Sequence, residues 1–145
     1  MKAQRAISRN CQIAVKLNDA LNDFVAGNAH AWEKAVEEFV APDVEYLPAS
    51  SLESGSADPY VGHGGMLRFA QEIVEHWPLF YTRLDEVIDL PPDRTLMLGW
   101  ATAEGEGTRG YASQLAALLS FRDGKLVASH GYLGHAEALA AIGRS

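Results

Sequence analysis

The sequence predicts an α+β fold in which a curved antiparallel sheet forms a cone covered by about three N-terminal helices. Apolar residues in the first half of the 145-residue chain recur at helical spacing, whereas the second half alternates apolar and polar residues as strands do. Turn-forming residues separate these segments. Helices followed by a run of strands indicate one α+β domain over residues 1–145, with its core over about residues 12–143.

Two amphipathic helices are expected at the start of the chain. The first begins near Asn10 and ends before Gly27, a residue suited to a C-terminal cap. The second follows Asn28, a residue suited to an N-terminal cap, and is expected to end at Pro42. Their apolar stripes comprise Ile13, Leu17, Leu21, Phe24 and Val25 in the first helix, and Trp32, Val36, Phe39 and Val40 in the second.

A strand, a loop and a third helix are expected next. Residues 43–47, DVEYL, have the pattern of a strand, and residues 48–59 are rich in serine, proline and small polar residues, as loops are. From Gly64 onward an apolar stripe indicates a helix that Pro78 ends. That stripe comprises Met66, Phe69, Ala70, Ile73, Val74 and Trp77.

Four strands in succession then predict an antiparallel meander. They cover residues 79–90, 94–106, 111–121 and 125–133, and the turns PPD and RDGK separate the first from the second and the third from the fourth. Residues 135–143 predict a short closing helix that ends at a glycine.

Composition excludes several classes of protein. The formal net charge is -7 and the basic residues are scattered, which argues against binding to nucleic acid. No apolar run approaches the roughly 20 residues of a membrane span, and the basic N-terminus has no apolar segment behind it, so we expect a cytoplasmic protein. The single cysteine, Cys11, has no partner for an internal disulfide and is expected to be inert.

Two glycine-rich stretches suggest chemistry, and neither has the context that such chemistry needs. The HGG of residues 63–65 lacks the G-x-S-x-G elbow of lipase-like hydrolases, and no Walker motif is present. Residues 105–110, GEGTRG, match G-x-G-x-x-G, but a dinucleotide fold needs this unit early in alternating strands and helices, with an acid about 20 residues later. His63 alone is too few ligands for a metal, so we expect no metal and no cofactor.

Four stretches together resemble a known family. They are D-V-E-Y, P-Y-V-G-H-G-G-M-L-R-F, F-R-D-G-K-L-V and Y-L-G-H-A-E-A-L. In their order and spacing the chain resembles the SnoaL-like polyketide cyclase branch of the nuclear transport factor 2-like superfamily, which also has a cystatin-like fold. The resemblance implies a cone-shaped α+β barrel with a mostly apolar cavity, a homodimer formed through the sheet, and a helix entry at Tyr60, Gly62 and Gly65. Such domains include isomerases, epoxide hydrolases, cyclases, dehydratases and non-catalytic binding modules, so the fold does not decide the function.

Strand alternation predicts which side chains face this cavity. Three sets share a face: Val44 and Tyr46; Leu96, Leu98, Trp100, Thr102 and Glu104; and Leu126, Ala128, His130 and Tyr132. In this register His130 is the candidate general base, Tyr46 the donor to a carbonyl that becomes an enolate, and Glu104 the second titratable group. Trp100, Thr102 and Tyr132 would contact the ligand, with Tyr60 and His63 near the cavity mouth.

The alternatives are that His130 is a hydrogen-bonded core histidine and Glu104 a solvated residue at a strand end. Pro48 and Gly134 stand where the isomerases and cyclases of this fold carry aspartates. We therefore expect the protein to bind a small hydrophobic or aromatic molecule. A further hypothesis is that it also performs cofactor-free acid/base catalysis of the isomerase, cyclase or dehydratase type on that molecule. A non-catalytic ligand-binding or dimerisation module is the alternative.

Overall fold

The computed structural model describes residues 8–49, 55, 58–77, 79–104 and 111–144. The GEGTRG stretch and most of the predicted loop over 48–59 lie outside these residues. The helices are α1 (Arg9–Val25), α2 (Ala29–Phe39), α4 (Gly62–His76) and α5 (His135–Ala141), and the strands are β1 (Val40–Leu47), β2 (Tyr60–Val61), β3 (Leu79–Leu90), β4 (Arg94–Glu104), β5 (Tyr111–Arg122) and β6 (Lys125–Tyr132). The three N-terminal helices, the strand that follows α2, the four-strand meander and the closing helix are confirmed.

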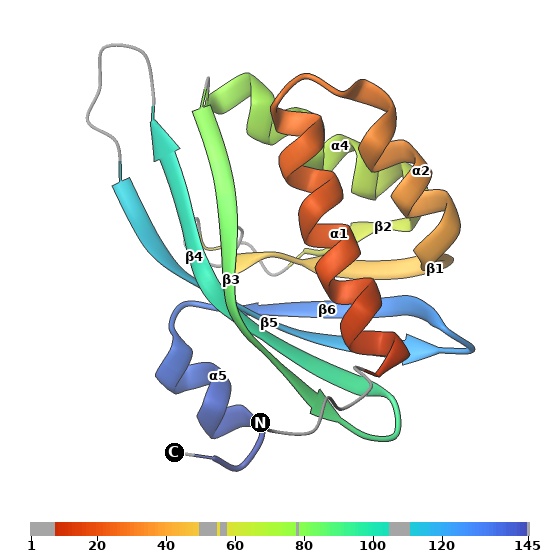
Figure 1. Ribbon diagram of the computed structural model, residues 1–145, viewed down its shortest axis with the longest axis vertical. Coiled ribbons are helices and arrows are strands. Elements are labelled where there is room, and N and C mark those ends of the chain that lie inside the picture. The colour runs from red at the N-terminus through yellow and green to blue at the C-terminus, as the bar shows by residue number, and fades with distance from the viewer. Residues whose placement is uncertain (1–7, 50–54, 56–57, 78, 105–110, 145) are drawn as a thin grey trace, which may run out of the picture.

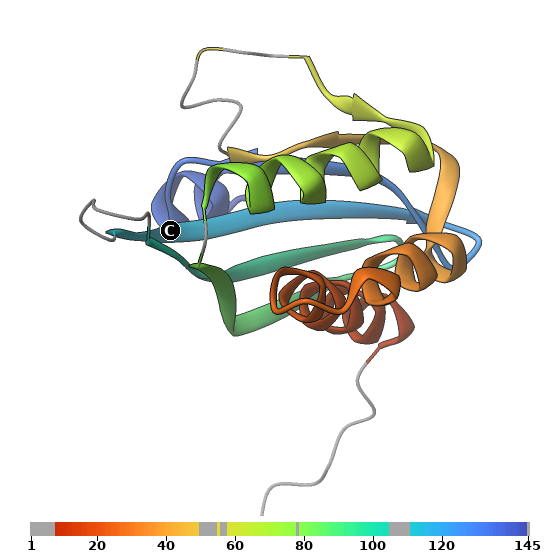
Figure 2. The ribbon, with the colours of Figure 1, turned by 90° about the horizontal axis from the view of Figure 1, so that it is seen from above.

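The strands form one six-stranded sheet in the order β2-β1-β6-β5-β4-β3. Neighbouring strands are antiparallel except β1 and β6, which are parallel. The predicted meander is correct, but the parallel pair and the short strand β2 were not anticipated. Figures 1 and 2 show that the sheet is curved, with α1, α2 and α4 on one side and α5 on the other.

Helix ends follow local chemistry. The Ser8 hydroxyl accepts a hydrogen bond from the Cys11 amide (3.1 Å), which caps α1 at a residue before the predicted start. α2 ends at Phe39 and the chain continues directly into β1, so Pro42 lies inside the strand rather than at the helix end. α4 begins at Gly62, whose φ of 73° is in the left-handed region that glycine tolerates.

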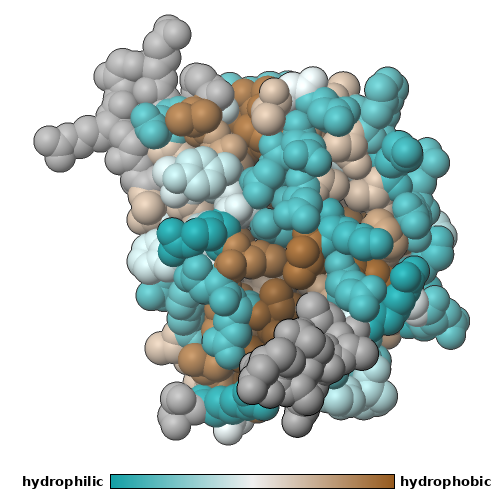
Figure 3. All heavy atoms as spheres, viewed as in Figure 1, coloured by the Kyte–Doolittle hydropathy of each residue, from teal (hydrophilic) through white to brown (hydrophobic). Residues whose placement is uncertain are grey.

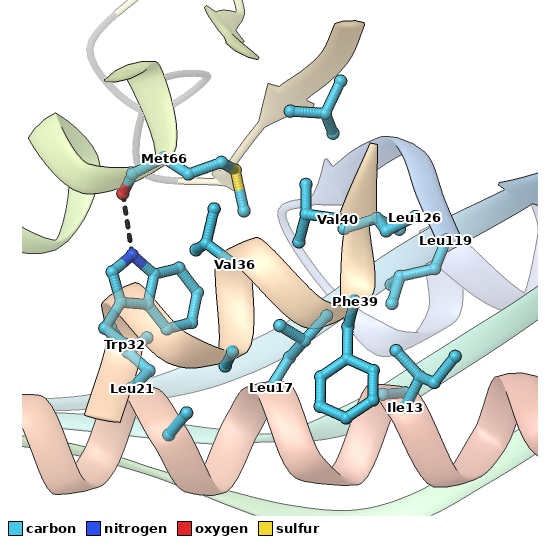
Figure 4. Close-up of a cluster of buried hydrophobic side chains, with 14 of the residues drawn as sticks. Ile13, Leu17, Leu21, Trp32, Val36, Phe39, Val40, Met66, Leu119 and Leu126 are labelled. Carbon is cyan, nitrogen blue, oxygen red and sulfur yellow. Dashed lines mark hydrogen bonds between the residues drawn. The ribbon is translucent and has the colours of Figure 1, made fainter. Parts of the chain in front are cut away.

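The main core lies between the three N-terminal helices and the sheet. Figure 4 shows Ile13, Leu17 and Leu21 of α1 facing α2, and the Trp32 indole donates a hydrogen bond to the Met66 carbonyl (2.9 Å). A second cluster on the other face packs α5 against β4 and β5 through Leu96, Leu98, Ala116 and Ala138. Both faces of the central strands are therefore partly covered.

Hydrophilic side chains cover much of the surface formed by the helices, as Figure 3 shows, and hydrophobic side chains gather toward the middle of that view. This separation is expected of amphipathic helices packed on a sheet. None of the helices in the described part of the chain is long and apolar enough to cross a membrane.

Candidate functional site

A cavity of about 480 Å³ lies between the sheet and helices α1, α2 and α4. Aliphatic residues and the aromatic rings of Trp32, Tyr46, Tyr60, Phe69, Trp77 and Phe80 form most of its wall. Three of these aromatic residues lie on or directly after helices, because the apolar stripes of α2 and α4 face the sheet. The cavity is large enough for a small organic molecule, since ligand pockets are typically about 300–1,000 Å³.

Two tyrosines stand side by side on the cavity wall. Tyr46 of β1 and Tyr60 of β2 are directly paired across the antiparallel strands, so their side chains project from the same face of the sheet. The Phe69 ring of α4 packs edge-on against both, with ring centroids 4.8 Å from Tyr46 and 5.5 Å from Tyr60. These contacts hold the two phenol rings in fixed positions in the cavity.

The Tyr60 hydroxyl donates a short hydrogen bond to Oε1 of Glu72, which lies on the cavity-facing side of α4. The other oxygen, Oε2, is 3.6 Å from Nε of Arg68, one helical turn earlier, and the Arg68 guanidinium lies over the Tyr60 ring at 4.9 Å. Desolvation, followed by the hydrogen bond to Glu72, raises the pKa of Tyr60 above its ordinary value. This wall of the cavity thus carries a carboxylate.

The Tyr46 hydroxyl is in a different position. Among the described residues it makes no hydrogen bond, yet it is not sealed off in the protein interior, because Tyr46 borders the cavity. Desolvation, and to a smaller extent the nearby Tyr60, raise the pKa of Tyr46 strongly, so the group remains a neutral O–H donor at neutral pH. It can donate to an acceptor atom of a bound molecule.

A second polar group borders the cavity where α1 meets β3. The Asn22 side chain exchanges two hydrogen bonds of 2.8 Å with the backbone of Thr82, and the Thr82 hydroxyl donates to Oδ1 of Asn18. Asn18 and Thr82 both line the cavity. These bonds hold α1 against the strand, so the helix forms a fixed wall.

The structure contradicts most of the predicted cavity register. On β4, Met97 and Ala101 line the cavity, so Trp100, Thr102 and Glu104 are on the opposite face or exposed. On β6 a bulge lies between the pairs Ser120–Ala128 and Phe121–Leu126, and it shifts the alternation. Leu126, Ser129 and Gly131 therefore border the cavity, while Ala128, His130 and Tyr132 are on the other face.

The expected acid/base set is consequently not assembled. His130 is exposed and stacks near Tyr132, with ring centroids 4.8 Å apart, so the alternative of a buried core histidine is also wrong. Glu104 is an exposed residue at the end of β4, as the alternative predicted. Trp100 contacts the ring of His135 at the start of α5.

Of the remaining candidates, Tyr46 and Tyr60 border the cavity and His63 does not. His63 lies in the first turn of α4, where its Nε2 donates a hydrogen bond to the Val40 carbonyl (2.7 Å). The glycine-rich stretch is therefore a helix entry that a histidine ties to β1. Gly65 allows close packing at this entry, because a Cβ atom there would lie 3.0 Å from the Tyr60 backbone.

Sequence reasoning missed Glu72. It follows Phe69 by three residues, so both lie on the same face of the helix, and this spacing was the available signal. Trp32, Phe69 and Trp77 belong to the apolar stripes of the predicted helices, and all three line the cavity. No cluster of histidine, cysteine or carboxylate side chains with the geometry of a metal site occurs within the described ranges.

No protein-family profile and no curated protein matches this sequence. Solved structures do match its fold. An NTF2-like protein of unknown function from Burkholderia pseudomallei has a TM-score of 0.70 at 20% identity, over 94% of this chain and 99% of that one. TerC, co-crystallised with polyporic acid, has a TM-score of 0.70 at 17% identity, over 90% and 95% of the two chains.

A protein from Jannaschia sp. that is named as a SnoaL-like polyketide cyclase has a TM-score of 0.70 at 14% identity, over 90% of each chain. The chain therefore has the NTF2-like fold that the sequence predicted. At these identities the likeness extends to the fold, which is shared by cyclases and by proteins of unknown function.

Proposed function

We propose that this protein binds a small hydrophobic or aromatic molecule in the cavity between the sheet and helices α1, α2 and α4. The observation that carries the proposal is the cavity itself, about 480 Å³ in volume and walled by six aromatic rings. Binding sites for small molecules are concave and mostly apolar, with a few fixed polar groups. The Tyr46 hydroxyl and the Glu72 carboxylate are such groups. The complex of TerC, a protein of the same fold, with polyporic acid supports this assignment.

Calorimetric titration with naphthylmethanol tests the proposal. Ala101→Phe places a ring in the cavity, because Ala101 lines it, and we expect this change to abolish binding. Thr102→Phe adds the same ring to the other face of the same strand and should leave the affinity within about twofold of the unchanged chain. Absence of binding by the unchanged chain, or equal affinity for both variants, would overturn the proposal.

Cofactor-free acid/base catalysis is a second candidate, because a donor and a carboxylate lie on the same wall. Tyr46 retains its predicted role as the donor to a carbonyl oxygen, and the base would be Glu72 rather than His130 or Glu104, which lie outside the cavity. Deuterium exchange into the methyl group of acetylnaphthalene, followed by NMR, tests this reaction class. Exchange that is faster than in buffer and lost in Glu72→Gln supports catalysis, and exchange at the buffer rate favours a binding module.

The homodimer expected from the resemblance stays a prediction. Leu79 and Tyr81 of β3 are 50% and 48% exposed, although both are large and apolar in part. Their exposure is consistent with a contact to a second copy through this part of the sheet. Light scattering after size-exclusion chromatography tests it, and Tyr81→Lys should shift a dimer toward the monomer.

A further inference from the structure

The charge of the cavity wall has one sign. Among the described residues that line the cavity, Glu72 is the only carboxylate, and none is a lysine or arginine. His76 also lines the cavity, and its Nδ1 donates a hydrogen bond to the Glu72 carbonyl (2.9 Å). Opposite charges attract more strongly beside a protein wall than in bulk water, and like charges repel. The wall therefore favours a cation and disfavours an anion.

The Glu72 carboxylate has unused capacity to accept hydrogen bonds. Two carboxylate oxygens together offer about four acceptor positions. The Tyr60 hydroxyl uses one on Oε1, and Arg68 approaches Oε2 at 3.6 Å, which is long for a direct hydrogen bond. Side chains of Arg68 and Glu72 are 58% and 40% exposed, so their pairing is weak. An ammonium group inside the cavity can therefore bind to Glu72 in addition to these partners.

The aromatic rings near the carboxylate provide a second source of attraction for a cation. Ring faces carry negative charge, and ammonium groups bind to them within about 6 Å. The Arg68 guanidinium already makes such a cation–π contact with one face of the Tyr60 ring. Phe69 lies one helical turn before Glu72, and its ring contacts both tyrosines. The aromatic rings and the Glu72 carboxylate therefore attract the same end of a ligand, the end that carries the positive charge.

From this arrangement we infer that the preferred ligand is a hydrophobic amine, whose apolar body fills the aromatic cavity and whose ammonium group pairs with Glu72. The inference rests on the proposed binding function and narrows its ligand class. The hydrogen bond from Tyr60 to Oε1 holds the Glu72 carboxylate in place and leaves acceptor positions on its oxygens for such an ammonium group.

Three probes that share one ring system test it: naphthylmethylamine, naphthylmethanol and naphthoate, which are a cation, a neutral molecule and an anion near neutral pH. Dissociation constants are measured by calorimetry for the unchanged chain, for Glu72→Gln and for Glu75→Gln. The glutamine at position 72 can still accept the Tyr60 hydrogen bond, so the fold is retained while the charge is removed. Glu75 is exposed on the same helix and does not line the cavity, which makes it the matched control.

We expect the amine to bind about tenfold more tightly than the alcohol, and the naphthoate more weakly than either. Glu72→Gln should remove the preference for the amine and leave the affinity for the alcohol within about twofold, and Glu75→Gln should change neither. Equal affinity of the unchanged chain for amine and alcohol, an equal loss in both glutamine variants, or preference for naphthoate would overturn the amine inference while the binding function stands. Failure of all three probes to bind would overturn the binding function itself.

Discussion

Tyr46 and Tyr60 are direct cross-strand partners on β1 and β2, yet only Tyr60 has a hydrogen-bond partner for its hydroxyl among the described residues. The same Phe69 ring packs against both phenols. The two tyrosines therefore differ because the Tyr60 hydroxyl donates a hydrogen bond to Glu72 and the Tyr46 hydroxyl does not. One tyrosine serves the structure by fixing a carboxylate, and the other presents a free donor to the cavity.

This difference predicts unequal effects of removing the two hydroxyls on the free energy of unfolding. Tyr60→Phe should lower the free energy of unfolding by about 1 kcal/mol, because Glu72 loses a hydrogen bond at a partly exposed site. Tyr46→Phe should change it by less than about 0.5 kcal/mol, since no protein hydrogen bond is lost. Urea unfolding measures both values. A larger loss for Tyr46→Phe than for Tyr60→Phe would show that the Tyr46 hydroxyl has a structural partner.

The raised pKa values of Tyr46 and Tyr60 predict loss of stability in alkali. Both are raised above the ordinary value of 10.0, so between that value and the folded pKa the folded chain holds protons that the unfolded chain has released. Their contribution is therefore complete below about pH 10 and is lost as the pH rises further. The free energy of unfolding should fall by up to about 1.4 kcal/mol per pH unit through Tyr46, and Tyr60, which is partly exposed to solvent, should contribute less.

Urea unfolding between about pH 9 and pH 11 measures this slope. Tyr46→Phe removes one of the two contributions and should make the slope less steep. An unchanged slope in Tyr46→Phe would mean that Tyr46 titrates in the folded protein as it does in the unfolded chain.

The fold was predictable because its elements carry strong local signals. The stripe containing Ile13, Leu17 and Leu21 has helical spacing and is buried, and the glycine after α1 adopts a φ of 117°, as a terminating glycine does. Strand β2 was not predicted because it has two residues, which are too few to show an alternating pattern of apolar and polar side chains. The parallel pairing of β1 with β6 joins segments far apart in the chain, and no local pattern contains that information.

The cavity register was not predictable because both faces of β4 are apolar. Leu96 and Leu98 are buried against α5, and Met97 and Ala101 face the cavity, so alternation does not distinguish the faces. On β6 the bulge near Val127 moved His130 to the outer face, and a one-residue shift inverts every side chain after it. Tyr46 was assigned correctly because Val44 and Glu45 differ clearly in polarity, which fixes the face of β1.

His135 and His130 should contribute very differently to stability, although both lie outside the cavity. The His135 ring donates a hydrogen bond from Nε2 to the Gly99 carbonyl (2.8 Å) and packs against Trp100, and its backbone amide donates to Oε1 of Gln114 (2.7 Å). Together these contacts hold α5 against β4 and β5. His135→Ala should therefore lower the free energy of unfolding by about 1–2 kcal/mol.

His130→Ala is the matched control for that change. His130 is exposed, so its removal should alter stability by less than about 0.5 kcal/mol and leave ligand affinity unchanged. Urea unfolding and amide hydrogen exchange over residues 135–141 measure the two effects. If His130→Ala weakens ligand binding as strongly as Glu72→Gln does, the outer face takes part in recognition and the assignment of the cavity wall is wrong.

Substitution of Gly99, the glycine of β4, should strongly lower the free energy of unfolding. A Cβ atom at this position would lie 1.9 Å from the Arg83 carbonyl oxygen, because β3 has an irregularity between Leu84 and Glu86 that brings its backbone over Gly99. A backbone atom cannot move aside as a side chain does, so Gly99→Ala should lower the free energy of unfolding by roughly 2–4 kcal/mol.

Gly64→Ala is the control for this change. Gly64 lies within α4, with no atom within 4 Å of the added Cβ, and alanine there should raise the free energy of unfolding by about 0.5–1 kcal/mol. Urea unfolding of the two variants measures both changes, and equal stability of Gly99→Ala and the unchanged chain would contradict the close approach of β3 to Gly99.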